Sequence, residues 1–114
     1  MSQNEDLFLK IINREIPADI VYEDDKVIAF KDISPSAPVH LLIVPLKHIK
    51  TTDDIQAEDK ELIGHIVFVA TKLARENNIA ESGYRMQFNC REHGGQMVYH
   101  IHLHLVGGKQ LPHF

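Results

Sequence analysis

Apolar residues in the second half of the chain recur at helical spacing. The repeat consists of Leu62, Ile66, Val69, Ala70 and Leu73. It predicts a long helix over roughly residues 57–77. A shorter apolar stripe near the N-terminus predicts a first helix, which Asp6 would cap. This helix should end near Glu15 or Ile16, because Pro17 follows and the residue before a proline disfavours helical geometry.

Five other segments have strand character, either alternating or apolar throughout. They are residues 20–23, 27–31, 39–44, 84–89 and 98–106. Asp24-Asp25 separates the first two and predicts a hairpin turn. The third is apolar apart from His40, as expected of a central strand that is buried on both faces. This order of elements predicts an α+β fold with a five-stranded antiparallel sheet and two helices.

Length and composition narrow the class of protein. With 114 residues, the chain is expected to form one domain over residues 1–114. Its net charge of −4, without a run of basic residues, argues against a nucleic acid partner. The single cysteine, Cys90, fits a reducing compartment. No signal peptide and no membrane-length apolar stretch is visible, so we expect a cytoplasmic protein with no membrane partner.

Three histidines alternate with apolar residues in the last predicted strand. Successive side chains of a strand point to opposite faces, so His100, His102 and His104 are expected on one face and the apolar residues between them in the core. In a chain with eight histidines, such a triplet is expected by chance only about 0.04 times. The triplet is therefore the strongest candidate for a functional site.

Imidazole chemistry suggests what this triplet does. A neutral imidazole can attack phosphorus, and with a reference pKa of about 6.5 it is mostly neutral at pH 7. Gly94 and Gly95, just before the strand, could let main-chain N–H groups approach an anion. Two alternatives stay open: a half-exposed strand that is merely rich in histidine, and a Zn²⁺ site. No CxxC or HExxH motif accompanies the histidines, so we expect no metal.

The segment from His100 to Val106 resembles the signature of the histidine triad family, in the branch of histidine triad nucleotide-binding proteins. Other similar segments are Ile16-Pro17 and residues 29–35, 37–40, 45–49, 83–85 and 94–96. The resemblance covers essentially residues 7–110. It implies a homodimer whose two sheets join, a purine nucleotide substrate and no cofactor. The implied reaction is hydrolysis of purine nucleoside phosphoramidates to a nucleoside monophosphate and an amine.

The same resemblance implies the roles of four histidines. His102 would attack the α-phosphorus and become nucleotidylated, and water would then release the nucleotide. His104 would contact the phosphate and assist proton transfer, while His100 would buttress the histidines and His40 would be linked to them as a fourth. A nucleotide-binding regulatory module with incidental hydrolysis is the alternative function.

Nucleotide-binding residues are also implied by the resemblance. The nucleobase pocket would be formed by Leu7, Phe8, Ile11, Phe30 and Ile33, the ribose hydroxyls would bind Asp32, and the ribose-phosphate end would be held by Asn89, Gly95 and the backbone around Met97. Core packing is an equal alternative for Ile11 and Ile33. For Asp32 the alternative is a carboxylate that caps the turn before Ser34.

Two features depart from the family pattern. Many members carry a serine where Met97 stands, and a methionine has no hydroxyl to donate to a phosphate or a leaving group. This difference concerns the rate and the leaving group, not the nucleophile. The chain also stops at Phe114, where many relatives continue, so the segment around His113 leaves substrate preference open.

Overall fold

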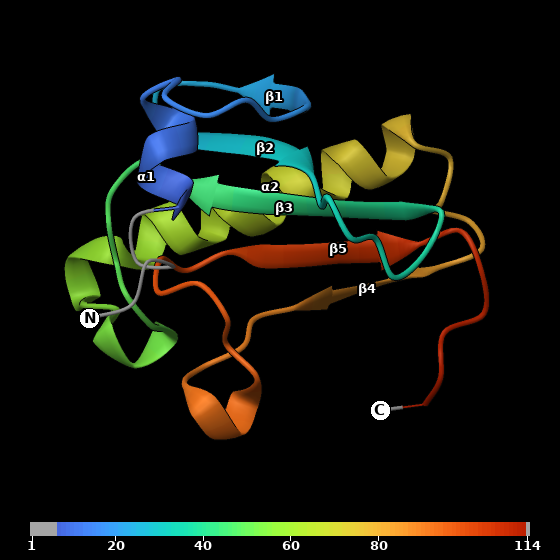
Figure 1. Ribbon diagram of the computed structural model, residues 1–114. Coiled ribbons are helices and arrows are strands. Elements are labelled where there is room, and N and C mark those ends of the chain that lie inside the picture. The colour runs from blue at the N-terminus through green and yellow to red at the C-terminus, as the bar shows by residue number, and fades with distance from the viewer. Residues whose placement is uncertain (1–6, 114) are drawn as a thin grey trace.

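A five-stranded antiparallel sheet with one helix on each face forms the fold in the computed structural model, which describes residues 7–113. Helix α1 (Leu7–Ile12) lies in front of the sheet and helix α2 (Lys60–Glu76) behind it (Figure 1). The strands are β1 (Ile20–Glu23), β2 (Val27–Lys31), β3 (Val39–Pro45), β4 (Tyr84–Gln87) and β5 (Leu103–Gly107). Short 3-10 turns are η2 (Thr52–Asp54), η3 (Ala57–Asp59) and η4 (Glu92–Gly94). The predicted α+β class is confirmed.

Strand β3 lies at the centre of the sheet, in the order β1-β2-β3-β5-β4. It pairs with β2 on one side and with β5 on the other, and Leu42 faces His104 across the second pairing. Every residue of β3 after Val39 is buried. The apolar run in the sequence therefore correctly predicted a central strand covered on both faces.

Each face of the sheet packs against its own helix, which gives two apolar cores. Behind the sheet, α2 packs on alternate residues of the strands, including Ala29, Ile43 and Leu105. In front of it, α1 contributes Phe8 and Ile11 to a smaller core. Because side chains alternate along a strand, His40 and His104 share the front face with α1.

The last strand is shorter than predicted, because it begins at Leu103 rather than at residue 98. Its pairing with β3 ends at the Ile43–Leu103 pair, and Pro45 lies two residues further along β3. Pro45 still pairs with Val27 of β2, but it has no N–H to donate on the side of β5. His100 and His102 therefore lie in an irregular segment ahead of the strand, and only His104 lies within it.

The helices also differ from the prediction at their ends. Helix α1 ends at Ile12 rather than near Glu15 or Ile16, because Arg14 adopts a left-handed conformation with φ of 61°. Asp6, the predicted cap, lies outside the described residues. Helix α2 begins at Lys60 because the tighter turn η3 occupies the predicted first turn. No helix within residues 7–113 is long and apolar enough to cross a membrane.

The turn between β1 and β2 is anchored to α2 through Asp24. Its carboxylate accepts hydrogen bonds from the main-chain N–H groups of Lys26 and Val27, from the Tyr22 hydroxyl and from the His65 ring on α2. Partial burial acts to raise the pKa of Asp24, but the hydrogen bonds, that from His65 first, hold the pKa well below its usual range. His65 thus ties the hairpin to the helix.

Gly107 is the glycine with the least room for a side chain. A Cβ at this position would lie 2.8 Å from the Cδ1 atom of Ile79 and 3.3 Å from the Cβ atom of Tyr84. We expect Gly107→Ala to lower the free energy of unfolding by about 1–3 kcal/mol through overpacking, measured by urea denaturation. Gly64→Ala is the matched control, since the new Cβ meets no atom within 4 Å on α2 and should stabilise the helix by about 0.5–1 kcal/mol. Wild-type stability of Gly107→Ala would contradict this packing.

Candidate active site

The irregular segment that carries His100 and His102 is held firmly against the chain that follows β3. The N–H group of Ile101 donates to the carbonyl oxygen of Ile49 at 2.8 Å. The Nε2–H group of His100 donates to the carbonyl oxygen of Pro45 at 2.7 Å. This segment has a defined conformation although it pairs with no strand, because these hydrogen bonds replace those of the ladder.

His100 is a fully buried imidazole that stays neutral. Burial disfavours its charged form and lowers its pKa to about 4. The exposed His48 ring stacks on it with the ring centroids 4.8 Å apart. His100 thus lies between the main chain of Pro45 and the ring of His48.

His102 presents one nitrogen with a lone pair. Its Nδ1 atom lies 2.8 Å from the carbonyl oxygen of His100, and a carbonyl can only accept, so Nδ1 carries the proton. The lone pair of the neutral ring is then on Nε2. Burial lowers the pKa of His102, and only 7% of the residue is exposed. Its ring packs edge-on against Phe8 at 4.9 Å and lies 5.0 Å from the ring of His104.

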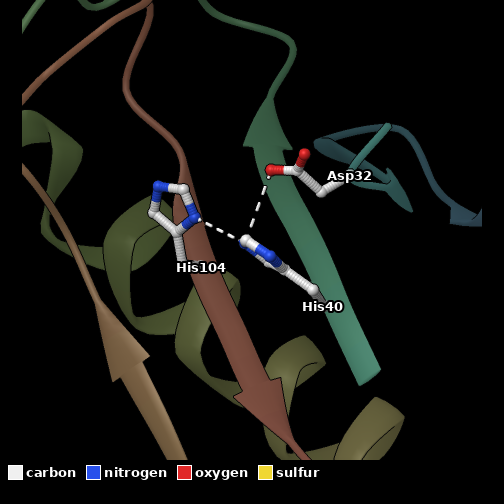
Figure 2. Close-up of side chains that lie close together, drawn as sticks. All are labelled: Asp32, His40 and His104. Carbon is white, nitrogen blue, oxygen red and sulfur yellow. Dashed lines mark hydrogen bonds and ion pairs between the residues drawn. The ribbon is translucent and has the colours of Figure 1, made fainter. Parts of the chain in front are cut away.

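His40 and His104 form a hydrogen-bonded pair beside Asp32 (Figure 2). The main-chain N–H of Ser36 donates to Nδ1 of His40 at 3.0 Å, so the proton of a neutral His40 is on Nε2. That Nε2 atom lies 2.9 Å from Nδ1 of His104 and 3.4 Å from Oδ2 of Asp32. Nδ1 of His104 accepts the hydrogen bond, which places the proton of His104 on its own Nε2.

His104 is therefore a neutral hydrogen-bond donor. Burial, followed by the neighbouring rings of His102 and His40, lowers its pKa to about 4. A second proton on His104 would have to enter at Nδ1, which faces the Nε2–H group of His40. The start of β5 and the segment just ahead of it thus combine a lone pair on His102 with an N–H donor on His104.

An apolar cavity of about 220 Å³ lies beside these rings, between α1 and the sheet. Six of the predicted nucleotide-binding residues line it: Leu7, Phe8, Ile11, Phe30, Asp32 and Ile33. Phe8 and Phe30 meet edge to face with ring centroids 5.4 Å apart. Ile11 is buried and also packs in the core, whereas Ile33 is 95% exposed, so core packing is the wrong interpretation for Ile33. Leu42 and Val98 line the cavity too and were not predicted.

The Asp32 carboxylate has two different surroundings. Its Oδ1 atom accepts the N–H of Ser34 at 2.8 Å, which is the turn-capping contact that the sequence left as an alternative. Its Oδ2 atom lies 3.4 Å from Nε2 of His40, and Asp32 also lines the apolar cavity. One carboxylate therefore caps a turn and still presents an oxygen to the site.

A polar loop around η4 carries the other predicted residues. The Asn89 side chain donates to the carbonyl oxygen of Gly94 at 2.7 Å, and Gly95 adopts φ of 79°. The Met97 side chain is 72% exposed. The buried Gln96 holds this loop in place, which the sequence did not indicate: its amide group donates to the carbonyl oxygens of Lys50 and Val98 and accepts the N–H of Arg91.

A second cavity of about 350 Å³ adjoins His40 and His104 and is also lined by residues of β4. Its lining includes Arg85 and Lys109 and no acidic side chain. The larger cavity next to it, of about 510 Å³, contains none of the four histidines. The imidazoles thus lie between an apolar space and a space that carries positive charge.

Comparison with known proteins agrees with this fold and this motif. The family described as "Scavenger mRNA decapping enzyme C-term binding" matches residues 5–113. The crystal structure of a HIT family hydrolase from Legionella pneumophila Philadelphia 1 is 53% identical, with a TM-score of 0.91 over 93% of this chain and 95% of that one. The chain belongs to the histidine triad family.

Within this family, particular relatives cover almost the whole chain. The purine nucleoside phosphoramidase of Escherichia coli (strain K12) is 55% identical over 107 residues, which span 94% of this chain and 90% of that protein. A histidine triad protein from Clostridium difficile is 43% identical, with a TM-score of 0.92 over 100% of this chain and 99% of that one.

The lowered pKa of His100 makes the stability of the fold depend on pH. An unfolded histidine takes up its proton near pH 6.5, whereas folded His100 takes it up near pH 4. The stabilisation that comes from keeping His100 neutral is therefore fully present above pH 6.5. It is lost as the pH falls toward 4, which lowers the free energy of unfolding by about 3 kcal/mol. Urea denaturation between about pH 7.5 and 4.5 should reveal the loss.

His100→Asn tests the assignment of this pH dependence. The variant lacks the titrating ring, so its free energy of unfolding should change less between pH 6.5 and 4 than that of the wild type. An unchanged slope in the variant, or a flat profile in the wild type, would show that His100 does not stay neutral in the fold.

Proposed function

We propose that this chain hydrolyses purine nucleoside phosphoramidates to a nucleoside monophosphate and an amine. The observation that carries the proposal is the neutral His102, whose proton is fixed on Nδ1 and whose ring lies 5.0 Å from that of the hydrogen-bond donor His104. The name of the Escherichia coli relative, which is 55% identical, supports the same reaction.

The apolar cavity suits the nucleoside half of the substrate. Phe8 and Phe30 supply flat rings for a purine, and the Asp32 carboxylate can accept hydrogen bonds from ribose hydroxyls. The loop around Gly95 would hold the phosphate through main-chain N–H groups. Asn89 would position that loop, because its side chain fixes the carbonyl of Gly94.

Catalysis would proceed in two displacements at phosphorus. Nε2 of His102 attacks the α-phosphorus, and the bond from phosphorus to the amine breaks, so the amine leaves with the electron pair and takes up a proton from water. The Nε2–H group of His104 would donate to a phosphate oxygen where negative charge develops. Water then attacks the nucleotidyl-histidine and releases the nucleoside monophosphate.

A homodimer is part of the proposal. The outer edge of β4 pairs with no other strand in the described part of the chain, and the side chain of Phe68 on α2 is largely exposed. An unpaired strand edge readily accepts another strand. Joining the β4 edges of two subunits would extend the two sheets into one.

We expect His102→Ala to lower turnover of adenosine 5′-phosphoramidate by about four orders of magnitude or more, because it removes the attacking atom. Binding of adenosine monophosphate, measured by calorimetry, should persist because the cavity is intact. His65→Gln is the control, since it removes an imidazole on the opposite side of the sheet and can still donate to Asp24. Near-wild-type turnover by His102→Ala would exclude His102 as the nucleophile.

Replacing Met97 by serine should change kcat/KM by only a modest factor, about tenfold or less. The side chain is mostly exposed, so its removal costs little packing, and the nucleophile does not depend on it. Met97→Leu separates the effect of a new hydroxyl from the effect of a lost methionine. A change beyond about a thousandfold, or about 4 kcal/mol, would mean that this position takes part directly in the reaction.

A further inference from the structure

Asp32, His40 and His104 have the composition and spacing of a transition-metal site. One ligand atom from each lies within 4.8 Å of the others (Figure 2). The separations from His40 Nε2 are 2.9 Å to His104 Nδ1 and 3.4 Å to Asp32 Oδ2. Neighbouring ligands of a tetrahedral zinc ion are about 3.3 Å apart, so only a small movement would admit the ion.

The main-chain N–H of Ser36 opposes such binding. A metal on Nε2 of His40 needs the lone pair of that atom, which moves the proton of a neutral ring to Nδ1. Histidines that bind metals normally donate this second N–H to an acceptor. Here Nδ1 lies 3.0 Å from the N–H of Ser36, which is itself a donor, so two hydrogens would face each other.

The same N–H group sets the direction of the hydrogen bonds toward the substrate. It donates to His40, His40 donates to His104, and His104 is left with an N–H on its outer nitrogen. If the direction were reversed, His104 would present a lone pair to a phosphate oxygen and repel it. The direction of this chain of donors thus decides whether His104 can stabilise negative charge.

We propose that the main-chain N–H of Ser36 is a positioning group that fixes the proton on Nε2 of His40. It thereby keeps His40 donating to His104 and keeps zinc out of the Asp32–His40–His104 cluster. The effect on catalysis rests on the proposed function. The proton positions and the zinc affinity are independent of it, so they can be measured whatever the reaction is.

Two substitutions at one exposed position separate the main-chain group from the side chain. Ser36→Pro removes the N–H, and Ser36→Ala keeps it while removing the hydroxyl. Pro35 and Pro38 already restrict this loop. Circular dichroism and nucleotide binding confirm that each variant is folded before it is compared.

Nitrogen-15 NMR of labelled histidines reports which ring nitrogen carries the proton. In the wild type and in Ser36→Ala we expect both His40 and His104 to be protonated on Nε2. In Ser36→Pro, His40 should gain protonation on Nδ1. Because the wild-type spectrum alone decides the proton position, the proposal is testable even if Ser36→Pro fails to fold. Protonation of wild-type His40 on Nδ1 would overturn it.

Zinc binding, measured by competition with a chromogenic chelator, gives the second readout. Ser36→Pro should bind Zn²⁺ at least about tenfold more tightly than the wild type and Ser36→Ala. Adding His40→Gln to Ser36→Pro should abolish this gain, which would place the ion at His40. Equal zinc affinity of the Ser36→Pro and Ser36→Ala proteins would overturn the proposal.

Steady-state kinetics on adenosine 5′-phosphoramidate gives the third readout. Relative to Ser36→Ala, Ser36→Pro should lose about a hundredfold in kcat, as for the loss of one oriented donor, with a much smaller change in KM. A rise in KM with an unchanged kcat would contradict the positioning role. If none of the folded proteins hydrolyses the substrate, the proposed function fails, whereas the NMR and zinc results still decide the proposal on Ser36.

Discussion

Pro45 has no N–H, so the antiparallel ladder between β3 and β5 cannot continue beyond the Ile43–Leu103 pair. The chain ahead of Leu103 leaves the sheet at this point. The carbonyl oxygens of Pro45 and His100 accept hydrogen bonds from imidazoles rather than from strand N–H groups. One residue without a donor thus converts the end of a strand into the frame of the candidate site.

Main-chain groups also decide where the protons of these rings lie. In the familiar serine hydrolase arrangement a buried carboxylate orients the catalytic imidazole and stabilises its charged form. Here a neutral carbonyl orients His102, and the main-chain N–H of Ser36 orients His40. Neutral partners do little to stabilise an imidazolium, and burial lowers the pKa of His102 and His104. The surroundings of His102 and His104 therefore keep these two rings uncharged, which suits a nucleophile and a hydrogen-bond donor.

The sequence predicted most of the fold because periodicity reports burial directly: the alternation that places Leu103 and Leu105 in the core was correct. It placed the start of β5 too early, since the alternating pattern begins several residues before Leu103, the first residue of β5 that pairs with β3. The link between His40 and His104 came from resemblance alone, because no local pattern joins residues 64 positions apart. The Ser36 contact was beyond sequence reasoning, because every residue except proline has a main-chain N–H and only the backbone path directs one at a ring.

The side-chain amide of Gln96 makes all its hydrogen bonds inside the protein. Its two hydrogens bind the carbonyl oxygens of Lys50 and Val98, and its oxygen accepts the N–H of Arg91. The loop that would receive a phosphate is consequently in a defined shape before any ligand arrives. A loop that needs no further ordering loses little conformational entropy on association, so more of the contact energy remains as affinity. Small ligands, which make few contacts, gain most from such prior organisation.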